Sequence, residues 1–327
     1  MPTDNENSMT NVEQAEKFWQ QLLTASSLTA DDKNLAVQHS ELLKLAFSRS
    51  AFLAETLIQK PSFLSHVIGV QSLKPKTPQK NQTQNTSEQD DALPVDLNEV
   101  QQNAPPKPYV DSDAQHISSE YESVLKGKLS NVSSEDDLLK VLREYRNQEM
   151  ARITFLDTLN KQTIESSLIQ VSALADVLIT QAYLWIYHHL AIRYGKPQSG
   201  NQDMHMYILG MGKLGGKELN FSSDIDLIFA YPEKGETQGG RKSLENQQFF
   251  TKVAQKLIQA LNKVTNDGQV YRVDMRLRPF GDSGPLVMHF AALEDYYQDQ
   301  GRHWERFAMV KARIINDDNS QNAVWLQ

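Results

Sequence analysis

The sequence predicts an α+β fold in which a mostly helical scaffold carries a small mixed sheet. Two observations predict this fold. Apolar residues recur at helical spacing before residue 192, whereas short apolar and alternating runs typical of strands begin only near residue 206. Of the 15 glycines, 13 lie at or after Gly195. Tight turns and close backbone approaches are therefore expected in the last third of the chain.

Composition limits the class of protein. The 327 residues are enough for about two structural units, and 39% apolar with 23% charged residues is typical of a chain that buries a core. The formal net charge of −8 argues against a nucleic-acid partner. The chain has no cysteine, which excludes disulfides, Cys-based zinc sites and thiol nucleophiles and fits a reducing compartment. The polar, acidic first 18 residues do not resemble a secretory signal, so we expect a cytoplasmic protein.

Two helical stretches flank a segment of different composition. We predict a helical lead-in over 1–72 and a helical segment over 116–198, with a helix start at Ser134. The apolar run 171–192 is interrupted by Asp, Gln and His residues, so it predicts a core helix and no membrane span. Six of the 12 prolines lie between, in a stretch without glycine or aromatic residues, which predicts a disordered linker or insertion over 73–115.

The last third predicts the catalytic core, over 199–288. The pattern there predicts strands at 206–210, 225–231 and 269–277 and a helix at 249–264. Residues 291–315 read as one further helix, part of a helical extension over 289–327 that ends in an apolar run and is expected to be cut short.

Two familiar phosphate-binding loops are tested against residues 210–229 and neither fits. Gly210 to Gly215 satisfies GxGxxG, but the eight residues between Gly215 and Asp224 are too few for the crossover helix of a dinucleotide-binding unit. A P-loop needs a glycine five positions before the one that precedes its lysine, and Met211 occupies that position relative to Gly216.

Three aspartates remain as the candidate catalytic and metal-binding set. Asp224 and Asp226 are two positions apart at the start of a predicted strand, so they share a face, and Asp274 lies on another predicted strand. Carboxylates within 4–6 Å of one another repel by roughly 4 kcal/mol per close pair at an effective dielectric near 20. Divalent cations relieve that repulsion, and hard oxygen ligands suit Mg²⁺, of which two ions would serve transfer at phosphorus.

The other candidates share a backbone or polar group able to contact phosphate or nucleotide. They are Lys213, Gly215, Gly216, Lys217, Ser222, Ser223, Arg276 and Arg278. The alternatives stay open, since Ser222 and Ser223 could only shape a turn and the arginines could only pair with acids. The basic residues Arg302, Arg306, Lys311 and Arg313 could be a solvated helix face or contact a ligand. Trp304 and Phe307 are predicted to be core rather than base-stacking residues.

A resemblance makes these expectations specific. The strings GMGKLGGKELNFSSDIDLIF, VDMRLRPFGDSGPLV and EDYYQDQGRHWERFAMVKARI resemble the polymerase-β-type nucleotidyltransferase superfamily. Within it they are similar to the family of bifunctional glutamine synthetase adenylyltransferase/adenylyl-removing enzymes, and to the amino-terminal, adenylyl-removing half. The Pro-rich stretch at 74–108 departs from the family pattern, as does the end at Gln327, where the family continues.

The resemblance implies a polymerase-β-like core and phosphorolysis of adenylyl-tyrosine on glutamine synthetase. Asp224 and Asp226 would hold both metal ions and Asp274 the second, while Gly215 and Gly216 would cradle phosphate. The implied partners are glutamine synthetase, inorganic phosphate, adenine nucleotides and, in the full-length family, the P-II nitrogen regulator. Two alternatives remain: forward adenylyl transfer from ATP to a protein or small-molecule acceptor, and a catalytically silent module that senses a nucleotide or a partner.

Overall fold

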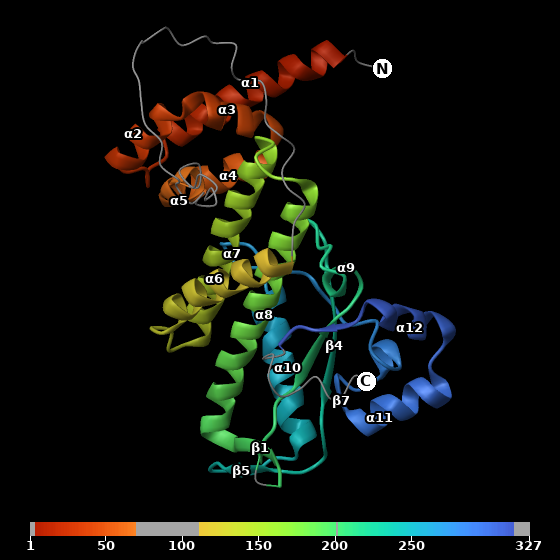
Figure 1. Cartoon of the computed structure of the whole chain (residues 1–327). Coiled ribbons are helices and arrows are strands. Elements are labelled where there is room, and N and C mark those ends of the chain that lie inside the picture. Colours follow the sequence, from red (N-terminus) through yellow and green to blue (C-terminus); the bar gives the residue numbers. More distant parts are fainter. Residues whose placement is uncertain (1–3, 70–110, 201, 317–327) are drawn as a thin grey trace, which may run out of the picture. The chain divides into compact units, whose positions relative to one another are not determined.

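The computed structural model describes residues 4–69, 111–200 and 202–316 (Figure 1). By its contacts the chain divides into two compact units, Met1–Tyr109 and Val110–Gln327, and each is described by itself. Of the predicted linker, residues 73–110 lie outside the described residues, as does the apolar end of the chain, and residues 111–115 belong to a helix. The finer division predicted from the sequence stays a prediction.

The described part of the first unit is helical. Its elements are α1 (Asp4–Leu23), α2 (Ala30–Gln38), α3 (Ser40–Arg49), α4 (Ala51–Gln59), the 3₁₀ turn η1 (Pro61–Phe63) and α5 (Leu64–Gly69). Thr29 and Ser50 cap α2 and α4, because each side-chain oxygen accepts a backbone N–H three residues on. The apolar faces of these helices meet in a core that includes Leu22, Leu43 and Leu57, each fully buried.

Four long helices form the scaffold of the second unit. They are α6 (Asp111–Leu129), α7 (Glu135–Thr158), α8 (Ile164–Tyr194) and α10 (Asn246–Asn262). The predicted start at Ser134 is confirmed, since its hydroxyl accepts the Asp137 N–H and caps α7. By length and composition α8 could cross a membrane, but 72% of its most apolar window is buried inside the protein. This burial identifies α8 as a core helix, as predicted.

A mixed five-stranded sheet lies against this scaffold, and its main path runs β6–β4–β3–β8. The strands are β3 (Tyr207–Gly210), β4 (Ile225–Tyr231), β6 (Val273–Asp274), β7 (Val287–His289) and β8 (Arg313–Ile314). β3 is antiparallel to β4 and β8, whereas β6 and β7 both pair with β4 in parallel, at its beginning and its end. The mixed sheet and helical scaffold confirm the predicted α+β class.

A second, three-stranded sheet begins where α8 ends. It has the order β2–β1–β5, with β1 (Gly195–Ser199), β2 (Gln202–Asp203) and β5 (Thr237–Gly239). Gly195 caps α8 at a φ of 80°, and a Cβ there would lie 2.2 Å from the Gln238 carbonyl oxygen. The predicted helical segment therefore ends at Tyr194 rather than at residue 198, because the close pairing of β1 with β5 turns the chain at this glycine.

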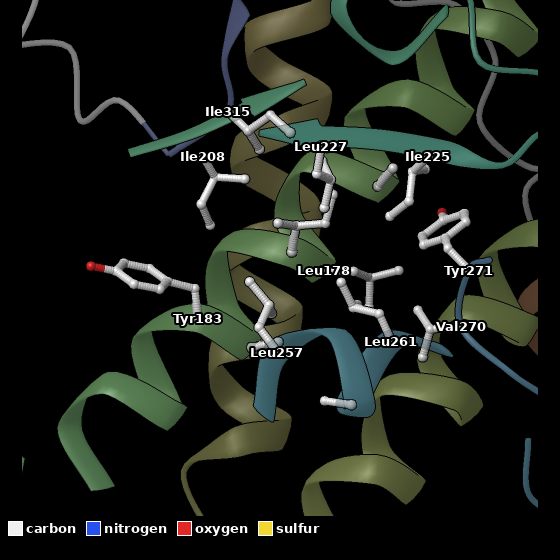
Figure 2. Packing of buried hydrophobic residues seen from close by; sticks show 14 of the residues in the cluster. Leu178, Tyr183, Ile208, Ile225, Leu227, Leu257, Leu261, Val270, Tyr271 and Ile315 are labelled. Carbon is white, nitrogen blue, oxygen red and sulfur yellow. The ribbon is translucent and has the colours of Figure 1, made fainter. Parts of the chain in front are cut away.

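Both faces of the five-stranded sheet are covered. Figure 1 shows α8 and α10 on one side of β4 and α11 (Phe290–Asp295) and α12 (His303–Ala308) on the other. On the scaffold side, Ile225 and Leu227 pack among the fully buried Leu178 and Leu257, as Figure 2 shows. Alternate residues of β3 and β4, together with Met211 just after β3, form a second cluster toward α11 and α12: Tyr207, Leu209, Met211, Ile228 and Ala230. This double burial explains why 225–231 is nearly all apolar.

The strand predicted over 269–277 is wrong in length. Only Val273 and Asp274 pair with β4, and Arg276 already belongs to a turn. The turn forms because the Asp274 carboxylate accepts the Arg276 N–H at 2.8 Å and the Met275 carbonyl accepts the Arg278 N–H at 3.2 Å. Local hydrogen bonds therefore replace the ladder that the alternating pattern predicted.

The single helix predicted over 291–315 is also wrong, as is a helical extension through the described part of 289–327. The segment consists of α11, a π turn η4 (Tyr296–Gln300), α12, a 3₁₀ turn η5 (Met309–Lys311) and β8. The chain becomes extended at Gly301, which ends the π turn. α12 then begins after Arg302, whose N–H donates to the Glu305 carboxylate at 2.7 Å. Trp304 and Phe307 are 48% and 77% exposed, so neither is a core residue.

Candidate active site

The sheet brings the predicted carboxylates together at the start of β4. Asp226 on β4 and Asp274 on β6 are direct partners in a parallel register. Neighbouring strands lie about 4.8 Å apart, so paired residues project side by side from the same face. Asp224 directly precedes β4 and is 47% exposed. The two strands thus form an acidic edge, defined here as Asp224, Asp226 and Asp274.

Asp226 is the central carboxylate of the acidic edge, and its surroundings disfavour its ionised form. Partial burial raises its pKa, and the negative charges of Asp274 and Asp224 raise it further, while Arg276 opposes them. Hydrogen bonds from Arg276 lower the pKa of Asp274, since the guanidinium Nε lies 2.9 and 3.1 Å from the two carboxylate oxygens. The repulsion expected from the sequence is therefore present at Asp226.

Each outer carboxylate is paired with an arginine. The Arg272 guanidinium binds Asp224 and also donates to the Ser222 carbonyl at 2.9 Å, while Arg276 binds Asp274. Within residues 4–69, 111–200 and 202–316, no group of three His, Cys, Asp or Glu side chains is arranged to hold a metal ion. The Arg272 and Arg276 guanidinium groups instead engage the outer carboxylates, Asp224 and Asp274.

The acidic edge nevertheless fits a divalent cation. Three carboxylates supply hard oxygen donors, and burial together with the negative charges of Asp274 and Asp224 raises the pKa of Asp226. The Arg272 and Arg276 side chains are 59% and 76% exposed, so both can rotate into solvent without disturbing the core. Exposed ion pairs are weak, and a doubly charged ion can replace them.

A short glycine turn adjoins the acidic edge. We call α9 (Gly212–Gly215) the glycine turn; it follows β3 directly. Gly212 has a φ of 54°, and a Cβ there would lie 3.0 Å from Asp226 Oδ2. Only glycine suits that backbone conformation so near a carboxylate. Sequence reasoning missed Gly212 as a site residue, although its place two positions after a strand and within GxG was a signal.

The predicted phosphate-binding glycines differ in their surroundings. Gly215 is buried, and a Cβ there would lie 1.9 Å from the Lys311 carbonyl oxygen, so backbone packing already demands glycine. Gly216 is exposed, and a Cβ would come no closer than 3.3 Å to the Glu218 side chain. Contact with phosphate stays a prediction for both residues.

The predicted polar residues around the glycine turn are only partly gathered. The exposed Lys213 ammonium lies 3.4 Å from the Ser223 hydroxyl, which also donates to the Asn220 side chain. Ser222 contributes its carbonyl to Arg272, as described above. Burial raises the pKa of Asp176 on α8, and the charges of Arg313 and Lys217 oppose that effect. The structure therefore brings Lys213 and Ser223 together, whereas a role of Lys217 in phosphate binding stays a prediction.

Arg278, unlike Arg276, is nearly buried. Its side chain is 11% exposed, and its Nη1 donates to the Met275 carbonyl at 2.7 Å and approaches Asp282 at 3.4 Å. Its Nε has no hydrogen-bond partner in the described structure. The charge of Arg278 also helps to lower the pKa of Asp274. Arg278 therefore supports the turn behind the acidic edge and keeps one donor available.

The basic residues of the last segment have separate partners. Arg302 pairs with Glu305 at 3.0 Å, Arg306 donates to the Gln298 carbonyl at 3.0 Å and Lys311 pairs with Glu218 at 2.8 Å. Arg313 does not belong to a solvated helix face. It lies on β8 and donates to the carbonyls at the end of the glycine turn. Helical spacing groups Arg313 with the other basic residues, but no local pattern indicates its partners, because they are distant in sequence.

Comparison with known proteins places these observations in a family. The family model for glutamate-ammonia ligase adenylyltransferase matches residues 108–327. The bifunctional glutamine synthetase adenylyltransferase/adenylyl-removing enzyme of Alteromonas mediterranea is 69% identical over 336 residues, which cover 100% of this chain and 31% of the relative. The enzyme of the same name from Shewanella woodyi is 57% identical over 198 residues, or 60% of this chain and 21% of the relative.

The chain thus spans about a third of the length of the relative that it matches from end to end. The resemblance stated from the sequence motifs is confirmed, since the family match includes both the helical scaffold of the second unit and the acidic edge. The chain belongs to the glutamate-ammonia ligase adenylyltransferase family, a family of nucleotidyltransferases.

Proposed function

We propose that this chain removes adenylyl groups from glutamine synthetase by metal-dependent phosphorolysis. An oxygen of inorganic phosphate forms a bond to the α-phosphorus of adenylyl-O-tyrosine, and the bond from that phosphorus to the tyrosine oxygen breaks. The products are ADP and unmodified glutamine synthetase. The observation that carries the proposal is the parallel register of Asp226 and Asp274, with Asp224 beside them.

The acidic edge would hold Mg²⁺, most simply two ions, with Asp224 and Asp226 shared by both and Asp274 binding the second. Bound there, the cations would supply charge stabilisation for the attacking and leaving oxygens. The residues fit this role because they supply oxygen donors and because Asp226 is partly buried and repelled by Asp274 and Asp224. Tyrosine has an ordinary pKa near 10, so its departure as tyrosinate needs no dedicated general acid.

Basic side chains beside the acidic edge would bind the phosphate groups. Arg276 forms an ion pair with Asp274 and is largely exposed. Guanidinium groups bind phosphate oxygens in a bidentate fashion. Once a cation replaces Arg276 at the Asp274 carboxylate, the Arg276 guanidinium can bind a phosphate instead. Lys213 and Ser223 add an ammonium and a hydroxyl at the glycine turn, and Arg278 adds its buried Nε, which has no hydrogen-bond partner among the described residues.

The relatives' names support glutamine synthetase as the protein substrate. We extend the proposal to a cytoplasmic location, to adenine nucleotides as ligands and to the P-II nitrogen regulator as a partner of the longer polypeptide. The names of the relatives include both directions of adenylyl transfer. Forward transfer of AMP from ATP to an acceptor is therefore the second candidate for this chain.

The test supplies adenylylated glutamine synthetase, phosphate and Mg²⁺ and measures ADP. We expect ADP formation by the chain, and loss of at least about a hundredfold in rate for Asp226→Ala, since electrostatic groups at a reacting phosphorus have effects of that order. Asp299→Asn is the matched control, because Asp299 is an exposed aspartate on η4 that does not belong to the acidic edge.

Three results would contradict the proposal. Full activity in a folded Asp226→Ala variant would exclude the acidic edge as the site. AMP incorporation from ATP without ADP formation from the modified substrate would favour forward transfer. Binding of ATP or AMP without turnover, with adenylylated glutamine synthetase present, would identify a sensing module instead.

A further inference from the structure

Arg313 donates hydrogen bonds to the end of the glycine turn. Its Nη2 donates to the Leu214 carbonyl at 3.0 Å and its Nε to the Gly215 carbonyl at 3.2 Å. These carbonyls belong to the last residues of α9, and the Leu214 carbonyl also accepts the Lys217 N–H at 3.2 Å. One guanidinium therefore bridges both carbonyls at the end of the turn.

Asp176 on α8 holds the same guanidinium from the other side. The two side chains form a forked ion pair, with Nη1 2.9 Å from Oδ2 and Nη2 3.0 Å from Oδ1, and they are 25% and 18% exposed. Burial raises the pKa of Asp176, and the charge of Arg313 opposes that effect. Because α8 is the buried core helix of the unit, Arg313 connects the glycine turn to a rigid part of the scaffold.

The backbone around Arg313 leaves the glycine turn little freedom. Arg313 pairs with Gly210 in the β8–β3 ladder, directly before the turn. The Lys311 carbonyl lies so near Gly215 that a Cβ there would come within 1.9 Å of it. At its other end the turn meets the acidic edge, since Gly212 adjoins Asp226 and the Met211 N–H donates to the Asp226 carbonyl at 2.9 Å.

We propose that Arg313, held by Asp176, is a positioning residue that keeps the glycine turn against Asp226. This inference rests on the proposed function, because it assigns to the pair the task of presenting the acidic edge to a cation and to phosphate. The task requires arginine: its planar fork serves two carbonyls and a carboxylate at once, whereas a lysine ammonium has one centre and cannot span them.

The experiment compares Arg313→Lys and Asp176→Asn with the wild-type chain. Binding of Mn²⁺ to the protein without substrate is measured by electron paramagnetic resonance, and the KM for phosphate is measured in the ADP assay. We expect each variant to weaken Mn²⁺ binding and to raise the phosphate KM, by about tenfold for Arg313→Lys, as for other residues that orient metal ligands. The double variant should be less than additive, since both changes break one connection.

The matched control is Lys311→Gln. Lys311 lies on the same segment and pairs with Glu218, but both side chains are 52% exposed. Loss of an exposed pair changes little, so Mn²⁺ binding and the phosphate KM should stay within about twofold of the wild-type values.

Wild-type Mn²⁺ affinity and phosphate KM in a folded Arg313→Lys protein would overturn the inference. A lower melting temperature with both constants unchanged would overturn it too, since the pair would then be merely structural. The Mn²⁺ measurement separates this inference from the proposed function: a chain without phosphorolysis activity that loses Mn²⁺ affinity in both variants would refute the reaction and keep the positioning role.

Discussion

Gly215 gives the most direct test of how the glycine turn is packed. In Gly215→Ala the new Cβ would lie 1.9 Å from the Lys311 carbonyl oxygen and 2.5 Å from the Gly210 carbonyl oxygen. Both atoms belong to backbone, so no side chain can rotate away. To reach the 3.0 Å below which Cβ atoms are essentially never found, β3, β8 or the turn itself must move.

The size of the stability loss in Gly215→Ala depends on which backbone segments must move. β8 pairs with β3 at Gly210, and Arg313 and the glycine turn share hydrogen bonds, so separation of the segments weakens several contacts together. Overpacking against fixed backbone costs about 1–3 kcal/mol and occasionally more. We expect Gly215→Ala to reduce the free energy of unfolding by about 3 kcal/mol, which in a unit of this size lowers the melting temperature by roughly 6–12 °C.

The assay is urea unfolding followed by circular dichroism, and Gly127→Ala is the matched control. Gly127 lies on α6, and a Cβ added there would have no atom within 4 Å, so the same chemical change meets no clash. Alanine in a helix should instead stabilise by about 0.5–1 kcal/mol. Equal effects of the two substitutions, or a stability loss below about 1 kcal/mol for Gly215→Ala, would refute the reasoning on backbone packing.

Two further predictions concern single side chains. His289 Nδ1 accepts the Ala292 N–H at 3.2 Å and caps α11, and burial lowers the pKa of His289 from 6.5, so the folded state favours the neutral ring. Stability should therefore fall as the pH drops through about 6.5. His289→Asn keeps a cap, so thermal melts between pH 5 and 8 should show a smaller dependence of its stability on pH. An unchanged pH dependence in this variant would contradict the prediction. Arg272→Gln removes the partner of Asp224, so Mn²⁺ binding measured by calorimetry should tighten by about threefold, and unchanged or weaker binding would show that Arg272 does not compete with the cation.

Several elements could be predicted because their signals are local. β4 occupies the predicted residues 225–231, and β3 differs from the predicted strand by a single residue. Spacing predicts the helix at 249–264, and one hydroxyl before three acids predicts the cap at Ser134. Periodicity and capping involve residues within a few positions of one another, so the chain itself carries the information.

The two failures have different physical origins. The alternation over 269–277 is a real pattern, but the Asp274 carboxylate binds the Arg276 N–H and turns the chain after two paired residues. The segment 291–315 has helical spacing, yet its last residues complete the sheet edge at β3 instead. A local side-chain hydrogen bond thus ends the strand, whereas a strand distant in sequence pairs with the backbone that would have continued the helix.

For the site, residue type and spacing were enough to propose the candidates: the carboxylates Asp224, Asp226 and Asp274, and glycines near them. The folded structure was needed to show that Asp226 and Asp274 are paired neighbours, that Gly212 adjoins Asp226 and that Arg313 links the turn to α8. The reason is that residue type and short-range spacing are properties of the chain, whereas strand register and side-chain pairing between distant segments arise only when the core packs and brings those segments together.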